Sequence, residues 1–285
     1  MLINLKEMLH TAENNNSAVG SYNVYNLESI LAVKEAVETT KLPAIIAFGE
    51  SYTAHAPIEV IASIVHTLFI TSSVPVVLHL DHAQNPSIIK KAIDCGFTSV
   101  MYDGSRLPLT ENIINSEKIV QMAHAANVSV EGELGYLNNE DGSGEVSTAC
   151  TGVDDAINYT EKTGVDALAI AIGNAHGLYK SAPKLNFSQL EKLHADVKCP
   201  LVLHGSSGIS FTDLQKAIDL GIRKFNINTE VSTTGVKALR EYLTQNPYEQ
   251  NPNLRLETVL KNARSQMSRK IAEFMQIFAN KEKIQ

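Results

Sequence analysis

Short apolar runs alternate with amphipathic segments along almost the whole chain, and this alternation restricts the fold more than any other feature. A continuous apolar run suits a strand buried on both faces, and a 3.6-residue periodicity suits a helix. The predicted strands cover residues 18–22, 44–48, 76–82, 99–102, 128–130, 167–172, 201–203 and 224–228. An eightfold strand–helix alternation over ~250 residues is typical of an α/β fold of the (β/α)₈ type, the TIM barrel.

The helices between these strands end at glycines in several places. Gly96, Gly164 and Gly221 each follow a predicted helix, where glycine readily adopts the closing left-handed conformation. The predicted helices cover residues 27–39, 57–71, 86–95, 111–126, 153–163, 187–195 and 212–220, with one or more helices from residue 231 to the end. The chain has no G-x-G-x-x-G motif of the kind found in doubly wound sheets. We therefore expect one barrel domain over residues 1–285, with extra C-terminal helices.

The composition excludes several classes of protein. With a net charge of −7, the 285-residue chain has no basic footprint that favours nucleic acid. No apolar run approaches the ~18 residues of a membrane span, and the N-terminus lacks the pattern of a signal peptide. Cys95, Cys150 and Cys199 are odd in number and lack C-x-x-C spacing, which argues against a disulfide framework and a thiolate zinc site. We expect a cytoplasmic protein with no nucleic-acid or membrane partner.

Histidine occurs at the ends of three predicted strands. His82, His176 and His204 follow the third, sixth and seventh strands, and the carboxyl ends of barrel strands share one mouth. A lone histidine there is more often an ordinary polar or core residue. Three imidazoles from separate strands, however, match a catalytic zinc site with an open fourth position. His79 lies inside the third strand, and we interpret it as structural.

Carboxylates accompany these histidines. Asp81 precedes His82, and because adjacent strand residues point to opposite faces, both serve one site only if the strand ends between them. Asp81 would then be a general acid/base near the metal or a hydrogen-bond partner of a ligand. Asp103, Glu131 and Glu133 add further carboxylates, and Glu131 and Glu133 share one face of their strand. Structural salt bridges are the alternative for each of these acids.

The segments after the last two strands favour an anion site. Residues 205–208 (GSSG) and 226–229 (NINT) offer backbone N–H groups and hydroxyls, and barrels often bind phosphate at this place. Gly177 allows a close approach of the backbone to a ligand, although plain turns are the alternative. Lys180 lies in a loop and Lys224 begins the eighth strand, so no lysine lies at an inward-facing strand end. We therefore expect no Schiff-base mechanism.

Six short motifs at these strand ends together carry a family resemblance. In chain order they are SYN at 21–23, LHLDH at 78–82, VEGELG at 130–135, AHG at 175–177, LHGSSG at 203–208 and NINTE at 226–230. They resemble the class II, zinc-dependent ketose-bisphosphate aldolases over nearly the whole chain. The resemblance implies a (β/α)₈ barrel that reversibly cleaves a ketose 1,6-bisphosphate, of the fructose or tagatose type. The products would be dihydroxyacetone phosphate and glyceraldehyde 3-phosphate.

The resemblance also implies a set of metal ligands. His82, His176 and His204 would bind Zn²⁺, which would act as a Lewis acid on the C2 carbonyl. Asp103 and Glu133 match positions where a displaced or second metal rests. A monovalent cation, Na⁺ or K⁺, often lies beside the substrate phosphate in the family, and members are commonly homodimers or homotetramers.

Two further roles follow from the resemblance. Asp81 would be the general acid/base that takes the proton from the C4 hydroxyl, and Glu140 matches a loop glutamate that exchanges the proton on the enediolate carbon. The implied substrate-binding residues are Asn23, Gly177, Gly205, Ser206, Ser207, Asn226, Ile227, Asn228 and Thr229.

Departures from the family pattern leave the substrate open. The loop after the fifth strand reads NNED at 138–141, where Gly-Gly is usual before the acidic residues. Asn228 agrees with fructose-type members, whereas HGSS at 204–207 is nearer to tagatose-type members. Ser232 stands where many members carry Arg or Lys near the distal phosphate. The alternatives are an aldolase of a related phosphorylated sugar or sugar acid, a metal-dependent hydrolase, and a non-catalytic barrel that supports an aldolase.

Overall fold

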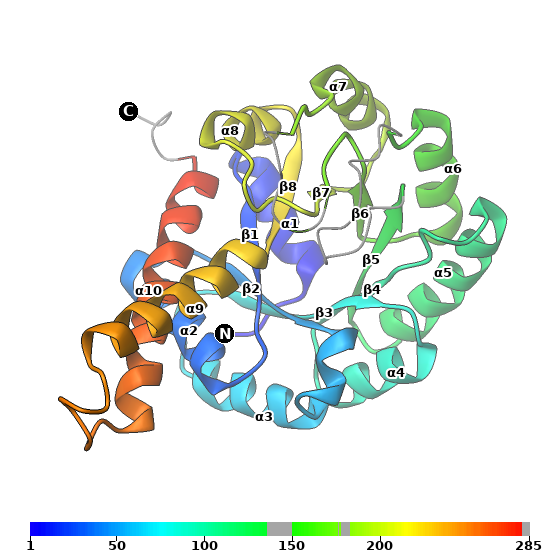
Figure 1. Cartoon of the computed structure of the whole chain (residues 1–285). Helices are drawn as coiled ribbons and strands as arrows, with labels where there is room; N and C mark the ends of the chain where they lie inside the picture. Colours follow the sequence, from blue (N-terminus) through cyan, green and yellow to red (C-terminus); the bar gives the residue numbers. More distant parts are fainter. Residues whose placement is uncertain (136–149, 176, 178–182, 281–285) are drawn as a thin grey trace.

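Eight parallel strands form a closed barrel at the centre of the molecule (Figure 1). The computed structural model describes residues 1–135, 150–175, 177 and 183–280. Each strand pairs in parallel with the next, and β8 pairs with β1. The strands are β1 (Val19–Asn23), β2 (Ala44–Gly49), β3 (Val76–Ala83), β4 (Ser99–Tyr102), β5 (Ser129–Leu134), β6 (Ala167–Ile170), β7 (Leu201–Leu203) and β8 (Ile222–Ile227). This confirms the predicted barrel.

Helices surround the barrel on its outer face (Figure 1). The predicted helices are present, with ends that differ by a few residues. The helices are α1 (Leu5–Asn14), α2 (Leu27–Thr40), the 3₁₀ helix η1 (Glu50–Ala54), α3 (Ile58–Phe69), α4 (Pro86–Asp94), α5 (Leu109–His124), α6 (Val153–Thr163), α7 (Phe187–Asp196), α8 (Phe211–Asp219), α9 (Thr229–Gln245) and α10 (Leu256–Phe278). The prediction missed α1, although the Asn4 side chain caps its first turn by accepting from the Glu7 N–H.

Alternate residues of β1, β2, β3, β6 and β7 enter two separate apolar cores. Outward-facing residues such as Leu78 and Leu168 pack with the helices in the larger core. Inward-facing residues such as Ile45 and Val77 pack with Leu9 of α1 in a smaller core inside the barrel. This period of two is the ordinary geometry of a strand. The next inward positions along the strands carry the polar side chains described below.

Several strands have ends that differ from the predicted ones by one to four residues, most of all β5, which covers Ser129–Leu134 instead of residues 128–130. β6 ends at Ile170 rather than at residue 172, and β8 begins at Ile222 rather than at residue 224. The difference in β8 matters, because it moves Lys224 from the start of β8 into its interior.

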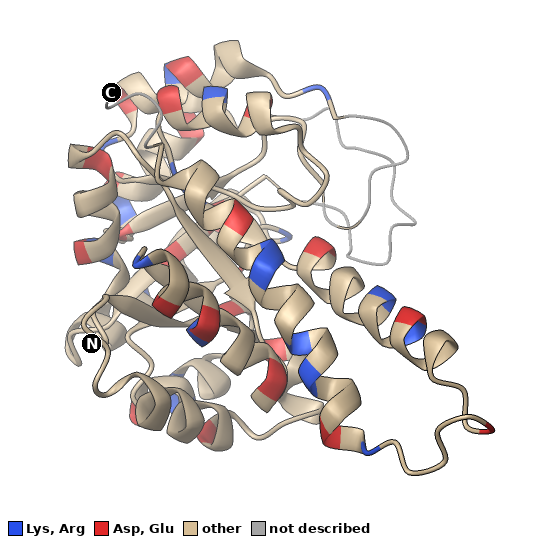
Figure 2. Ribbon diagram, turned by 90° about the vertical axis from the view of Figure 1, so that its left-hand side faces the viewer, with Lys and Arg blue, Asp and Glu red and all other residues tan. Residues whose placement is uncertain are grey.

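The last two helices form a hairpin beside the barrel. α10 packs against both α9 and α2. The end of the hairpin that joins α9 to α10 projects beyond the barrel (Figure 2). Within the described ranges, no helix combines the length and the apolar character that crossing a bilayer requires.

Candidate active site

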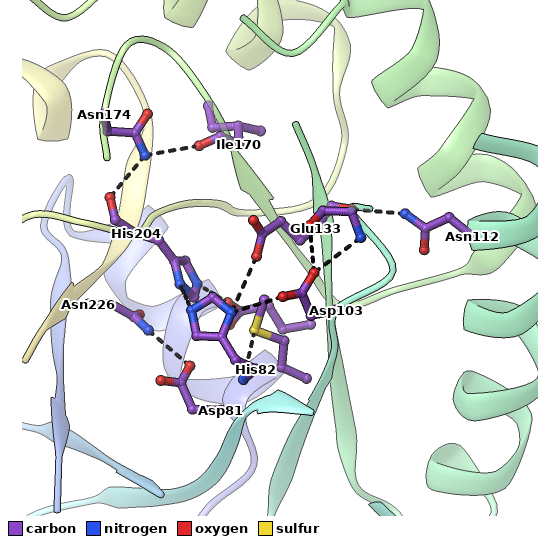
Figure 3. Close-up of polar contacts among 12 residues, drawn as sticks. Asp81, His82, Asp103, Asn112, Glu133, Ile170, Asn174, His204 and Asn226 are labelled. Carbon is purple, nitrogen blue, oxygen red and sulfur yellow. Dashed lines mark hydrogen bonds and ion pairs between the residues drawn. The ribbon is translucent and has the colours of Figure 1, made fainter. Parts of the chain in front are cut away.

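Polar side chains from five strands meet at the carboxyl-terminal end of the barrel (Figure 3). This is the end at which barrels present their chemistry. The cluster consists of Asp81 and His82 on β3, Asp103 after β4, Glu133 on β5, His204 after β7 and Asn226 on β8. All six residues are among those that the sequence predicts for the site.

A bulge in β3 presents Asp81 and His82 to the same site. The pairing of β3 with β4 shifts register between Leu80 and Ala83, and His82 has a φ of 46°. This left-handed conformation is strained for a non-glycine residue, at a cost on the order of 1 kcal/mol. The condition that the strand must end between Asp81 and His82 for both to serve one site is not needed, because β3 continues to Ala83 and the bulge reorients the side chains instead.

His82 and His204 face each other at the centre of the cluster. His82 Nε2 lies 2.8 Å from His204 Nδ1, and the two rings are nearly perpendicular at 78°. Burial lowers the pKa of His82, but the carboxylates of Asp81 and Asp103 outweigh burial and raise this pKa to about 10. Charged His82 therefore donates its Nε2–H to His204 Nδ1. On its other side, His82 Nδ1 lies 3.2 Å from Asp103 Oδ2.

Two overlapping groups of these side chains offer ligands to a metal ion. One group is Asp81, His82 and His204, and the other is His82, Asp103 and Glu133. Within each group, one ligand atom from each residue lies within 4.8 Å of the others. Imidazole nitrogen and carboxylate oxygen are the ligands that zinc takes in catalytic sites.

The carboxyl group of Glu133 gives a second, independent indication that these side chains fit a metal ion. Its Oε2 atom is buried and has no hydrogen-bond partner among the described residues, and it lies 3.7 Å from His82 Nδ1. Burial and the Asp103 carboxylate raise the pKa of Glu133 well above its ordinary value. A cation bound here would satisfy the orphaned oxygen and favour the charged carboxylate. The residues present therefore fit a metal ion.

Asp81 is held as a carboxylate by two amides. Asn23 Nδ2 donates to its Oδ2 at 2.9 Å, and Asn226 Nδ2 donates to its Oδ1 at 3.0 Å. Burial would raise the pKa of Asp81, but His82 and His204 hold it well below its usual range. The site therefore contains an ionised, oriented carboxylate that can accept a proton.

A pocket beside this carboxylate collects most of the predicted substrate-binding residues. Seven of them line it together with Asp81 and His82: Asn23, Gly177, Gly205, Ser207, Asn226, Asn228 and Thr229. Ser206 turns its hydroxyl to the Leu203 carbonyl, to which it donates at 2.9 Å. The Ile227 side chain packs in the outer apolar core. These last two residues can therefore face the pocket only through their backbone.

The start of α9 borders the same pocket. Asn228 occupies the N-cap position, but its own side chain does not cap the first turn, in which Ser207 Oγ accepts from the Glu230 N–H at 3.3 Å. The first backbone N–H groups of a helix, together with its dipole, favour an anion. One acidic side chain lies nearby: Glu230 Oε2 accepts from the Gly208 N–H at 3.2 Å. The phosphate site at this place stays a prediction.

Two tyrosines that sequence analysis did not select hold Asn228. The Tyr25 hydroxyl donates to Asn228 Oδ1 at 3.0 Å, and Asn228 Nδ2 donates to the Tyr52 hydroxyl at 2.9 Å. The two aromatic rings meet edge to face, with centroids 5.0 Å apart. Tyr52 lies on η1, far from Asn228 in the sequence, so no local pattern could have indicated this contact.

A second group of charged side chains lies inside the barrel, further from its carboxyl-terminal end than the site. Lys224 is fully buried and its Nζ lies 2.8 Å from Glu131 Oε2. The prediction that Lys224 begins β8 is therefore wrong, because the residue lies within the strand and its side chain is inside the barrel. Residues two apart in a strand point to the same face, so Lys224 is expected on the inner face together with Asn226. His79 is also fully buried, and its Nδ1 lies 2.8 Å from Ser99 Oγ.

Two predicted site residues fall outside the described part of the chain. His176 was predicted as the third zinc ligand, and Glu140 as the glutamate that exchanges a proton with the substrate. Their roles stay predictions.

Comparisons with known proteins agree over nearly the full chain. A family model described as fructose-bisphosphate aldolase class II matches residues 3–283. The fructose-bisphosphate aldolase of Staphylococcus aureus strain Mu50 is 38% identical over 283 residues, which cover 96% of this chain and 97% of that protein. The YdjI aldolase from Escherichia coli K12 has a TM-score of 0.87 and 33% identity, and the match covers 98% of this chain and 97% of that chain. Fructose-bisphosphate aldolase from Campylobacter jejuni has a TM-score of 0.84 and 25% identity, covering 97% and 95%.

Proposed function

This chain belongs to the class II fructose-bisphosphate aldolase family and is a lyase, and on that premise we propose that it is a zinc-dependent aldolase of ketose 1,6-bisphosphates. The reaction is reversible cleavage of a fructose- or tagatose-type substrate to dihydroxyacetone phosphate and glyceraldehyde 3-phosphate. The observation that carries the proposal is the position of Asp81. Two asparagines orient this carboxylate, and it lies beside the paired His82 and His204.

Asp81 performs the proton transfer in this proposal. In the cleavage direction, one carboxylate oxygen takes the proton of the C4 hydroxyl as the bond between C3 and C4 breaks. In the synthetic direction, the same carboxyl returns that proton. Asn23 and Asn226 keep the carboxylate oriented, because each donates to a different oxygen.

His82 and His204, with His176 as the predicted third ligand, hold the metal. When bound, zinc supplies Lewis-acid polarisation of the substrate carbonyl. Asp103 and Glu133, together with His82, form a second group of side chains that could hold a metal ion. Asp103 also hydrogen-bonds His82 Nδ1, which leaves His82 Nε2 directed toward His204.

The backbone around the pocket holds the phosphate of the dihydroxyacetone half. Gly177, the 205–207 segment and the first turn of α9 surround this part of the pocket. A monovalent cation, Na⁺ or K⁺, beside the phosphate is part of the proposal. Glu140 remains the proposed group for proton exchange on the enediolate carbon.

A related phosphorylated sugar or sugar acid is the second candidate substrate. Among the described residues that line the pocket, none is lysine or arginine. Ser232 follows the first turn of α9, at the place where many family members carry Arg or Lys near the distal phosphate. These observations favour a substrate whose distal end carries less charge than a second phosphate.

The assembly and location of the enzyme are also proposals. We propose a homodimer or homotetramer in the cytoplasm. None of the three cysteines, all of which the structure describes, forms a disulfide, and this supports a reducing compartment.

A panel of cleavage assays tests the proposed reaction. Fructose 1,6-bisphosphate, tagatose 1,6-bisphosphate, a ketose 1-phosphate and a phosphorylated sugar acid are each incubated with enzyme as purified, after EDTA, and after zinc is restored. Release of dihydroxyacetone phosphate is measured. We expect EDTA to abolish cleavage, zinc to restore it, and borohydride to trap no substrate on the protein.

Three results would contradict the proposal. Activity that survives complete metal removal would exclude the metal-dependent mechanism. Release of inorganic phosphate without cleavage of a carbon–carbon bond would favour a hydrolase. Purified protein that contains no stoichiometric zinc and cleaves no substrate in the panel would favour a supporting, non-catalytic barrel.

A further inference from the structure

A buried ion pair lies directly beneath His204, inside the barrel. Lys224 on β8 and Glu131 on β5 have side chains that are 0% exposed. Lys224 Nζ lies 2.9 Å from Glu131 Oε1 and 2.8 Å from Oε2, so the ammonium contacts both carboxylate oxygens. Neither residue lines the pocket, and the proposed reaction assigns neither of them a role.

A gain in folding stability is a weak explanation for a buried ion pair. Removing two charges from water costs several kcal/mol per ion, and a well-packed apolar pair of similar volume is often as stable. The inner apolar core of the barrel, with Val77 and Val202, shows that this fold can fill its interior without charge. The ion pair therefore calls for a further physical reason.

Glu131 connects this pair to His204. Its Oε1 lies 2.8 Å from His204 Nε2, and the His204 side chain is also 0% exposed. A carboxylate paired with an ammonium accepts hydrogen bonds and donates none. His204 Nε2 must therefore carry the proton, and the lone pair lies on Nδ1, the atom 2.8 Å from His82 Nε2.

The backbone of His204 is anchored as well. Asn174 Nδ2 donates to the His204 carbonyl at 2.9 Å, and Asn174 Oδ1 accepts from the Ile172 N–H at 2.8 Å. With the backbone fixed, the orientation of the imidazole depends on its two ring nitrogens. One faces Glu131 and the other faces His82.

We propose that Lys224 is a positioning residue for the metal site. It anchors the Glu131 carboxylate so that Oε1 accepts from His204 Nε2, and this keeps His204 Nδ1 unprotonated and directed at the metal. Partners behind ligating histidines typically change metal affinity 10–100-fold when they are replaced. The inference rests on the proposed function, because it assumes that His204 is a metal ligand.

A neutral double variant separates positioning from charge balance. Lys224→Met alone leaves an unpaired buried carboxylate and can prevent folding. Lys224→Met with Glu131→Gln removes both charges and keeps similar volumes. A glutamine amide both donates and accepts, so it no longer dictates the tautomer of His204.

A second ion pair on the same strand supplies the matched control. Arg223 is the neighbour of Lys224 on β8 and points to the other face, where its Nε lies 2.7 Å from Glu13 Oε2. This pair is far from the strand ends that carry the site. Arg223→Met with Glu13→Gln removes the same two charges without touching His204.

Two measurements test the proposal on full-length protein. Zinc affinity is measured by competition with a chelator, and the His204 tautomer of metal-free protein is read from ¹⁵N NMR of labelled histidine. For Lys224→Met/Glu131→Gln we expect zinc to bind about 10–100-fold more weakly, with loss of the pure Nε2–H signature. For Arg223→Met/Glu13→Gln we expect wild-type affinity and tautomer.

The outcomes distinguish this inference from the proposed function. If wild-type protein binds zinc and cleaves substrate but the Lys224→Met/Glu131→Gln variant keeps wild-type affinity and tautomer, the positioning role is wrong. An equal loss of affinity in the Arg223→Met/Glu13→Gln control would also overturn it, because the effect would then be a general loss of stability. If wild-type protein itself fails to bind zinc, the proposed function fails first.

Discussion

At the amino-terminal end of the barrel the interior is apolar and covered by α1, whereas at the carboxyl-terminal end it is filled with acids, amides and imidazoles. β3 passes through both regions. Val77 packs in the inner apolar core, His79 is buried in the middle of the barrel, and Asp81 lies in the pocket. β7 changes in the same way between Val202 and His204.

The difference indicates how one barrel separates stability from chemistry. Apolar burial at the α1 end stabilises the fold by roughly 25 cal/mol per Å². Buried polar groups at the other end cost free energy unless each is hydrogen-bonded, and Glu133 Oε2 has no hydrogen-bond partner among the described residues. Substitutions at the α1 end should therefore change mainly the free energy of unfolding, whereas substitutions at the carboxyl-terminal end should change mainly activity and metal binding.

The largest effect is expected at the carboxyl-terminal end. Asp81→Ala removes the proposed general acid/base and should lower kcat for bisphosphate cleavage by about 10²–10⁴-fold. Zinc content should stay near that of wild type, because His82 and His204 remain. Initial rates and metal content measured on the same sample check both statements. Asp94→Ala, on the exposed surface of α4, is the control and should leave kcat unchanged. Near-normal turnover of Asp81→Ala would remove Asp81 from its role.

At the α1 end, the expected loss is in stability. Leu9 is fully buried in the inner apolar core, and Leu9→Ala should lower the free energy of unfolding by about 2–5 kcal/mol. Urea denaturation measures this loss, while zinc affinity and kcat should stay within about twofold of wild type. A large loss of zinc affinity in folded Leu9→Ala would show that the two ends are not separate.

Between the two ends, His79 should make stability depend on pH. Burial and the charge of Lys224 lower the pKa of His79 from 6.5 to about 4 in the folded state. Between those values the unfolded chain binds more protons, so the free energy of unfolding falls as the pH falls from 6.5 to 4, by up to about 3 kcal/mol. Urea titrations of metal-free protein check this. His79→Asn keeps an amide near Ser99 and should show a shallower dependence, and an equally steep one would contradict the assignment.

The smallest effect is expected at the rim of the pocket. Tyr52→Phe removes the hydroxyl that accepts from Asn228 Nδ2, which is worth about 1 kcal/mol. We expect KM for the bisphosphate to rise about fivefold with little change in kcat. Tyr248→Phe, at a side chain 75% exposed, is the control. A fall in kcat with an unchanged KM would place Tyr52 in the chemistry instead.

The barrel could be predicted because its signal is local and repeats eight times. Each apolar run and each helical period is readable within a short window. Helix α1 was missed because its apolar side chains are buried only by the open end of the barrel, which does not exist until the strands close. The ends of β6 and β8 were misplaced because strand ends depend on pairing with neighbours.

The candidate site was predictable to the extent that strand ends converge. His82 and His204 were found in this way, and the structure brings them to 2.8 Å. The bulge at His82 was not predictable, because its left-handed backbone is imposed by the surrounding structure. The strand period indicates that Lys224 faces inward, but its ion pair was not predictable, because the partner Glu131 lies on a different strand.

A zinc titration of metal-free protein tests the central claim most directly. Cleavage activity and bound zinc are measured at each addition, for wild type and for a variant carrying His82→Ala and His204→Ala. We expect wild-type activity to rise in proportion to bound zinc and to level off at about one equivalent per chain, the stoichiometry of a single catalytic zinc site. The variant should bind no zinc in this range and stay inactive. Full activity before zinc is added, or unchanged tight binding in the variant, would contradict the account.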